Sequence, residues 1–112
     1  MLYAGPWQRT SPVKAREPVR LLAEEEAVLL LRLHRRGKYG ASHLLEVNLL
    51  RGLRRNHLDR YREALRILKR DGILAAKSTK HGPAVFIPSR LGHEVLEALR
   101  KWFPDLQNPP WL

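Results

Sequence analysis

The side chains of this 112-residue chain that can do chemistry are mostly cations. The chain has 21 Lys and Arg against 11 Asp and Glu, and its formal net charge is +10 at pH 7. Residues 51–90 hold 11 of the cations, and the acids there are Asp59, Glu63 and Asp71. A positive excess concentrated in one third of a small protein predicts a charged face and a polyanionic partner.

The sequence lacks the residue patterns that support metal binding or catalysis. Its five His, which are His34, His43, His57, His81 and His93, show neither the HExxH nor the His-x3-His spacing of metal ligands. There is no cysteine, so a thiolate metal site, a disulfide and a thiol nucleophile are excluded. A glycine-rich phosphate loop and a G-x-S-x-G motif are also missing. We therefore expect no enzyme activity, no metal and no cofactor.

Hydropathy predicts a chain without a membrane segment. The N-terminus has no signal-peptide hydrophobic core, and the longest apolar run, Ala27–Leu31, is far shorter than the roughly 20 residues that cross a bilayer. The absence of cysteine allows a reducing compartment. We expect a soluble protein in the cytoplasm, located at the nucleoid if it binds DNA.

The chain divides into a basic arm (1–20), one domain (21–103) and a Pro-rich tail (104–112). Pro6, Pro12 and Pro18 interrupt any helix in the arm. The arm could lie along phosphates, pack Tyr3 and Trp7 on a neighbouring subunit, or stay disordered.

The domain begins with two expected helices. Residues 21–36 are strong helix formers, with acids in the first turns and Arg in the last. Gly37 and Gly40 then leave room for a very short strand. A second helix is expected from a Ser42 cap to about Leu50, and its buried side would be formed by Leu44, Leu45, Val47, Leu49 and Leu50. Residues 51–55 form the turn, which is longer than in a minimal helix-turn-helix.

A third helix, 56–71, separates an apolar stripe from a cationic side. Leu58, Tyr61, Leu65 and Leu68 follow helical spacing and predict contact with a core. Five cations share the other side with one mid-helix anion. Asn56 is expected to cap this helix, with Asp59 in the first turn.

A hairpin and a fourth helix complete the domain. Strands are expected at Ile73–Lys77 and Ala84–Ile87, joined by residues 78–83. Ser89 would cap the last helix, which buries Leu91, Val95, Leu99 and Trp102 and ends by Pro104. The predicted fold class is mainly α with a small β-hairpin (α+β): a three-helix core plus hairpin and C-terminal helix.

Two runs in this region resemble winged helix-turn-helix regulators. Tyr61–Leu74, which reads YREALRILKRDGIL, looks like their recognition helix and first wing strand, and Phe86–Leu99 resembles the strand-to-helix junction of MarR-like and PadR-like proteins. The resemblance implies a winged helix over residues 21–103 that binds double-stranded DNA and regulates transcription.

The resemblance also implies roles for the cations. Helix 56–71 would enter the major groove, with base contacts among Asn56, His57, Asp59, Arg60, Arg62, Glu63 and Arg66. Arg62 and Asn56 are the preferred readers, although capping competes for Asn56, and Asp59 and Glu63 would orient Arg neighbours. Phosphates would be contacted by Arg51, Arg54 and Arg55 in the turn and by Lys77, Thr79, Lys80 and His81 in the wing.

Two other functions remain open. The chain could bind DNA or RNA without sequence preference, as an architectural or replication protein does. Alternatively, it could be a protein-interaction winged helix whose aromatic anchors are Tyr3, Trp7, Trp102, Phe103 and Trp111. A homodimer could form through the aromatic terminal segments and the first and last helices.

Overall fold

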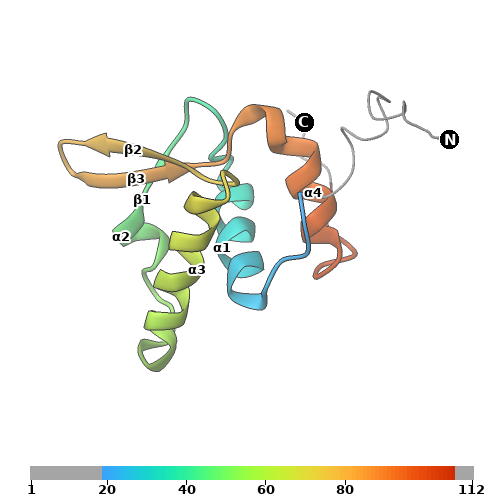
Figure 1. Ribbon diagram of the computed structural model, residues 1–112, viewed down its shortest axis with the longest axis horizontal. Helices are drawn as coiled ribbons and strands as arrows, with labels where there is room; N and C mark the ends of the chain where they lie inside the picture. Colours follow the sequence, from blue (N-terminus) through green and yellow to red (C-terminus); the bar gives the residue numbers. More distant parts are fainter. Residues whose placement is uncertain (1–18, 108–112) are drawn as a thin grey trace, which may run out of the picture.

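The structure is a computed structural model of the chain, and it describes residues 19–107. Within these residues there are four α-helices and a three-stranded antiparallel sheet, which confirms the expected α+β class. The elements in chain order are α1 (Glu24–Arg35), β1 (Leu44–Leu45), α2 (Glu46–Leu49), α3 (Leu58–Arg70), β2 (Ala75–Thr79), β3 (Gly82–Phe86) and α4 (Gly92–Arg100) (Figure 1). Short 3-10 helices, Arg55–His57 and Ser89–Leu91, lead into α3 and α4.

Some expectations fall on residues 1–18 and 108–112 and lie outside the described part of the chain. They include the basic arm up to Pro18, the roles of Tyr3, Trp7 and Trp111, and a dimer contact through the terminal segments. Over residues 19–107, no helix combines the length and apolar character needed to cross a membrane.

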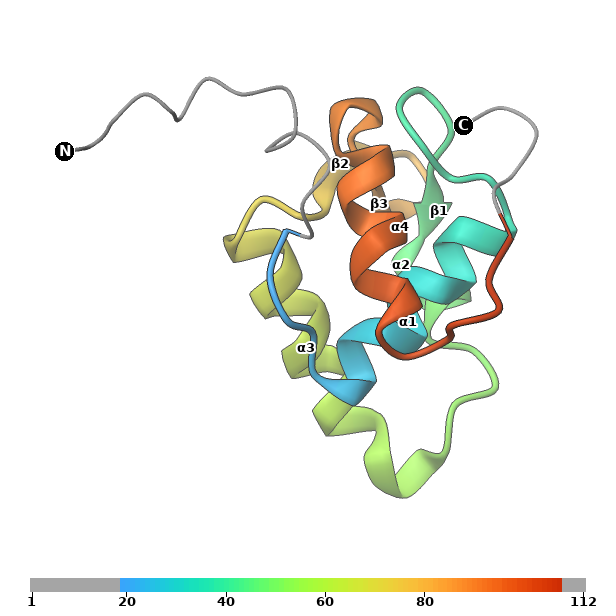
Figure 2. The ribbon, with the colours of Figure 1, turned by 90° about the vertical axis from the view of Figure 1, so that its right-hand side faces the viewer.

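Helix α1 is the centre of the core. It lies between α3 and α4 in Figure 1 and behind α4 in the turned view of Figure 2, and it packs against both helices. Its Leu29, Leu30 and Leu33 are completely buried because the apolar positions recur at helical spacing. The same core contains fully buried side chains from α2, α3, α4 and the β3 region: Leu49, Leu68, Val85, Ile87, Val95 and Leu99.

An ion-pair cluster fixes the start of α1. The helix begins at Glu24, three residues later than expected, and Glu26 Oε1 accepts a hydrogen bond from the Ala23 N–H at 2.8 Å. Arg20 donates to both Glu26 oxygens at 2.8 and 2.7 Å, and its Nε donates to Asp71 Oδ2 at 3.0 Å. Arg20, which the sequence places in the arm, therefore joins the start of α1 to the end of α3.

Opposing effects act on the Glu26 carboxyl. The residue is only 4% exposed, and burial alone would raise its pKa. The Arg20 guanidinium and the Ala23 amide outweigh burial and hold the pKa of Glu26 below its ordinary value. Glu26 is therefore a buried, ionised anchor for Arg20.

The expected second helix is mostly wrong. Leu44 and Leu45 form β1, which pairs with Val85 and Ala84 of β3, and only Glu46–Leu49 is helical. Ser42 caps nothing, because the residue before α2 is Leu45. A short apolar run does not distinguish a strand from a helix by its period, and the free edge of β3 decided the outcome.

The hairpin is tighter than the sequence predicts. Thr79 pairs with Gly82, so Lys80 and His81 alone form the loop instead of residues 78–83. Pro83 lies within β3 although it has no N–H to donate. β1 pairs only with Ala84 and Val85, so no hydrogen bond from Pro83 to β1 is required. The sheet order is β1-β3-β2.

The other two predicted helix caps, Asn56 and Ser89, are also wrong. Each lies in a 3-10 turn, and the residues that precede α3 and α4 are His57 and Leu91, neither of which caps through its side chain. Trp102 is not buried in the core as expected. It is 43% exposed, and its indole N–H donates to the Leu22 carbonyl at 3.0 Å.

Candidate nucleic-acid interface

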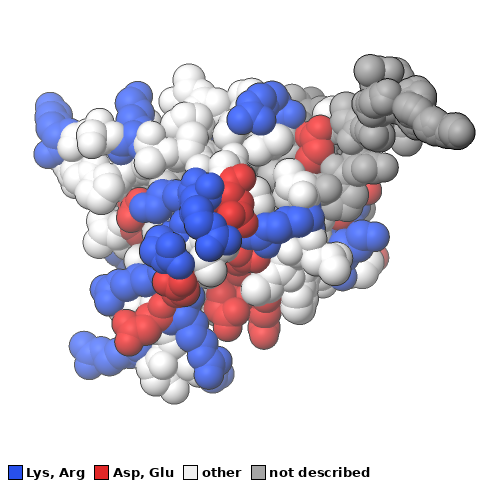
Figure 3. Space-filling model, in the orientation of Figure 1, with Lys and Arg blue, Asp and Glu red and all other residues white. Residues whose placement is uncertain are grey.

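The predicted site residues lie in the turn after α2, in α3 and in the β2–β3 hairpin. The β2–β3 hairpin, α2 and α3 occupy the left of Figure 1, and α4 lies on the right. In the same orientation, the space-filling view shows Lys and Arg at the hairpin and over α3 (Figure 3). Acidic atoms are interspersed with the cations along α3, so the surface is not uniformly positive.

The turn before α3 carries charges that are free to bind an anion. The side chains of Arg51, Arg54, Arg55 and Asn56 are exposed there, and His57 is half-buried. Across residues 19–107, the three arginines have no carboxylate within ion-pair distance. Such solvated guanidinium groups are suited to phosphate contacts.

Arg32 of α1 holds this turn, and the sequence did not single it out. Its Nη1 donates to the Leu49 carbonyl at 3.1 Å and to the Arg51 carbonyl at 2.6 Å. These oxygens belong to the last residue of α2 and the first residue of the turn, where helix carbonyls lack partners. The only signal was a cation in the last turn of α1, which the helix dipole explains equally well.

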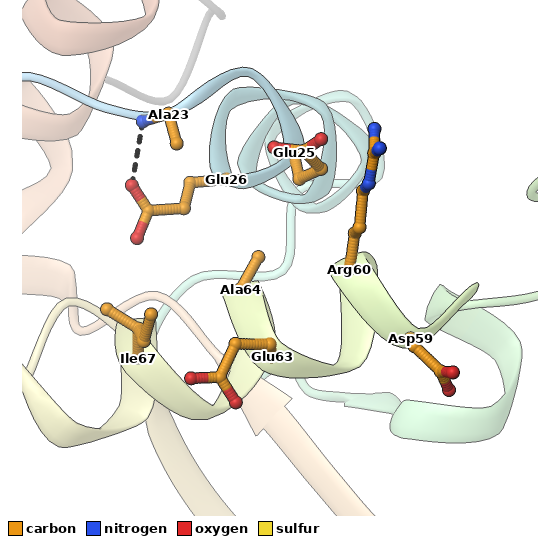
Figure 4. A pocket seen from close by; sticks show the side chains of 8 residues that line it. All are labelled: Ala23, Glu25, Glu26, Asp59, Arg60, Glu63, Ala64 and Ile67. Atoms are coloured by element: carbon orange, nitrogen blue, oxygen red, sulfur yellow. Dashed lines mark hydrogen bonds between the residues drawn. The ribbon is translucent and has the colours of Figure 1, made fainter. Parts of the chain in front are cut away.

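Arg60 and Arg62 lie on opposite sides of α3. Two residues correspond to about 200° around a helix. Arg60 lines a groove between α1 and α3, where it extends toward α1 on the side of Glu25 (Figure 4). Arg62 lines a second groove, between α2 and α3. The sequence grouped the two as neighbours, but only Arg62 lies on the α2 side.

Most cations of α3 are already paired. Arg66 binds Glu63 through both carboxylate oxygens, with Nε 2.9 Å from Oε1. Lys69 Nζ lies 2.8 Å from Glu46 Oε2, and Arg70 Nε lies 2.9 Å from Asp71 Oδ1. The hydrogen bond from Arg66 lowers the pKa of Glu63 below its ordinary value.

Arg62 is held more weakly than its neighbours. Its Nη1 is 3.8 Å from Asp59 Oδ1, and both side chains are well exposed. Asp59 and Glu63 thus pair with Arg62 and Arg66, the contacts expected of acids that orient Arg neighbours. The expectation of a helix side with five cations and one anion is corrected, because Glu46 and Asp71 come from neighbouring segments and neutralise Lys69 and Arg70.

The hairpin presents a second group of free cations. Lys77, Lys80 and His81 are exposed, and neither lysine has an ion-pair partner in the described chain. The Thr79 hydroxyl is instead used inside the turn, where it donates to the Gly82 carbonyl at 2.7 Å and accepts from the His81 N–H at 3.1 Å. Thr79 therefore shapes the loop that presents Lys80.

A hydrogen-bonded pair of titratable side chains, His34 and Tyr39, lies away from these segments. His34 Nδ1 is 2.8 Å from the Tyr39 hydroxyl, beyond the end of α1. Burial raises the pKa of Tyr39 to about 12 and, with the charges of Arg35 and Arg100, lowers the pKa of His34. Over the described range, His, Asp and Glu do not gather in the groups of three or more that a metal site needs.

Comparisons with protein-family models, curated proteins and solved structures each gave no match to this chain. Function is therefore inferred from the geometry and charge of the turn, α3 and the hairpin. Together these segments offer a helix flanked by unpaired cations, which is an arrangement suited to binding a phosphate backbone.

Proposed function

We propose that this chain is a winged helix-turn-helix protein that binds double-stranded DNA and regulates transcription. In this proposal α3 enters the major groove and the β2–β3 hairpin is the wing along the backbone. The observation that carries it is the presence of unpaired cations in the turn that precedes α3 and in the hairpin that follows it. A dimer of such domains would read a pseudo-palindromic site.

The proposal gives different tasks to the cations. Phosphate contacts come from exposed cations without partners, namely Arg51, Arg54, Arg55, Lys77 and Lys80. Arg62 is the base reader because it lies in the first turns of α3 and its weak contact with exposed Asp59 costs little to break. A guanidinium can pair with guanine O6 and N7 in a bidentate manner.

Selection from random duplex DNA, followed by competition titration, tests this function. A regulator should prefer its selected sequence over random duplex by about a thousandfold or more. If about five phosphates are neutralised, the slope of log K against log salt is about -4 to -5. Absence of duplex binding at low salt would overturn the proposal.

Binding of nucleic acid without sequence preference is the second candidate. It is favoured by the ion pairs of Arg66, Lys69 and Arg70 within and beside α3. Most unpaired charge is then on the turn and the hairpin, the segments that would contact phosphates. This candidate predicts equal affinity for selected and random duplexes, and RNA competition would extend it to RNA.

A protein-interaction role is the third candidate, and the exposed Trp102 favours it. It predicts little salt-dependent duplex binding. Substitution of Arg62 or Lys80 by Ala would then leave partner binding intact.

A further inference from the structure

We propose that Val47 contacts the C5 methyl group of a thymine that lies next to the guanine read by Arg62. The inference rests on the proposed function and adds a second specificity determinant to the same surface. It also gives the protein a means to distinguish DNA from RNA at that base, because uracil lacks the methyl group.

Val47 is exposed at a place where the sequence predicted burial. Its side chain is 62% exposed, whereas Leu49, two residues later on α2, is fully buried. Residues two apart on a helix point in nearly opposite directions, so burial of Leu49 turns Val47 outward. The pairing of Leu44 and Leu45 with β3 fixes this orientation of α2.

Val47 lines one wall of the groove between α2 and α3. The groove has a volume of about 390 Å³ and is lined by Val47, Leu50, Arg51, Leu58 and Arg62. Leu50 and Leu58 are half-buried, so the surface between the two arginines is apolar. Arg62 and Val47 therefore face the same space from different helices.

The charges around this groove suit DNA. Glu46, the neighbour of Val47, is neutralised by Lys69, so its carboxylate does not repel phosphates. Arg51 is exposed and lacks an ion-pair partner in the described part of the molecule. The thymine methyl is the apolar group that the major groove presents, and apolar side chains contact it there. An apolar strip with cations at its rim complements this combination of methyl group and phosphates.

Replacement of thymine by deoxyuridine tests the contact directly. In the selected duplex, each thymine is replaced in turn and affinity is measured by fluorescence anisotropy. We expect one position, adjacent to a guanine, to lose about fourfold in affinity, as the removal of one buried methyl group predicts.

The variant Val47→Ala identifies the protein partner of that methyl group. We expect it to bind the thymine duplex about fourfold more weakly and to show no further loss with deoxyuridine. The matched control is Leu21→Ala, which removes another exposed apolar side chain, 79% exposed, that precedes α1 and is not on α2. It should retain full sensitivity to deoxyuridine.

The outcomes separate this inference from the proposed function. Insensitivity to every deoxyuridine, or sensitivity that persists in Val47→Ala, overturns the inference while selective duplex binding still supports the function. A selected site without a thymine next to guanine also overturns it. If Val47→Ala loses a protein partner but no DNA affinity, the groove is a protein-docking site and the inference is wrong.

Discussion

Lys69 of α3 and Glu46 of α2 form an ion pair in which Nζ lies 2.8 Å from Oε2. The two side chains are 32% and 17% exposed, so the pair is partly shielded from water. It joins the two helices that border the Val47 groove, and it cancels a cation on the surface proposed to meet DNA. Its effects on folding and on binding should therefore have opposite signs.

Glu46→Gln tests these opposite effects. We expect tighter binding to all duplexes and a salt slope steeper by about 0.9, because Lys69 is released to neutralise one more phosphate. The free energy of unfolding should fall by about 0.5–1 kcal/mol, measured by urea denaturation. Glu97→Gln is the control, since Glu97 pairs with Arg100 on α4, and it should leave duplex affinity unchanged.

Arg62→Ala should cost about 1–3 kcal/mol of binding to the selected duplex and relax one base preference. Arg66→Ala is the matched comparison, and its smaller effect is expected because Glu63 already holds the Arg66 guanidinium. Titration of single-base variants of the site measures both. Equal losses on every sequence for the two variants would remove Arg62 from the role of reader.

Lys80→Ala should weaken binding to selected and random duplexes alike. The loss of one phosphate contact reduces the salt slope by about 0.9. Anisotropy titrations at several salt concentrations measure this change. Lys101→Ala serves as the control because Lys101 is exposed at the end of α4, and a slope reduced equally by Lys101→Ala would contradict the assignment of the hairpin as the wing.

Arg20→Gln should destabilise the fold by about 2 kcal/mol at pH 7, mainly because buried Glu26 loses its partner. The pKa of Glu26 is lowered in the folded state, so its contribution is complete above the ordinary carboxyl pKa of about 4.3 and is lost as pH falls through the folded-state value. The difference between the native protein and Arg20→Gln should therefore shrink between pH 5 and pH 3. A constant difference over this range, in urea denaturation, would contradict the pairing; exposed Arg90→Gln is the control.

Gly40→Ala should destabilise the fold more than Gly72→Ala does. Both glycines have positive φ, 59° and 77°, so alanine strains the backbone at each position by about 1 kcal/mol. Only at Gly40 would the new Cβ collide with a side chain, the Ser89 hydroxyl. Ser89→Ala should recover part of the loss in Gly40→Ala and none in Gly72→Ala, as thermal unfolding of the double variants can show.

Local patterns predicted much of the architecture. Helix propensity and the placement of charges identified the first long core helix, and the helical spacing of Leu58, Leu65 and Leu68 identified the second, since both signals depend on neighbours in sequence alone. The sequence also located the hairpin and the basic region. The observed strands extend two residues further toward the loop than expected, to Thr79 in β2 and from Gly82 in β3.

Contacts between distant residues decided the rest. Whether Leu44 and Leu45 form a strand depends on the free edge of β3, and their pairing exposes Val47. Which cations stay free depends on carboxylates from other segments, since Glu46 of α2 pairs with Lys69 of α3. The turn before α3 is held by hydrogen bonds from Arg32 of α1. The sequence by itself thus determined the first, third and last helices and the surplus of positive charge. Only the tertiary structure decided which of those charges are unpaired, because an ion pair requires two side chains to meet in space, whatever their separation along the chain.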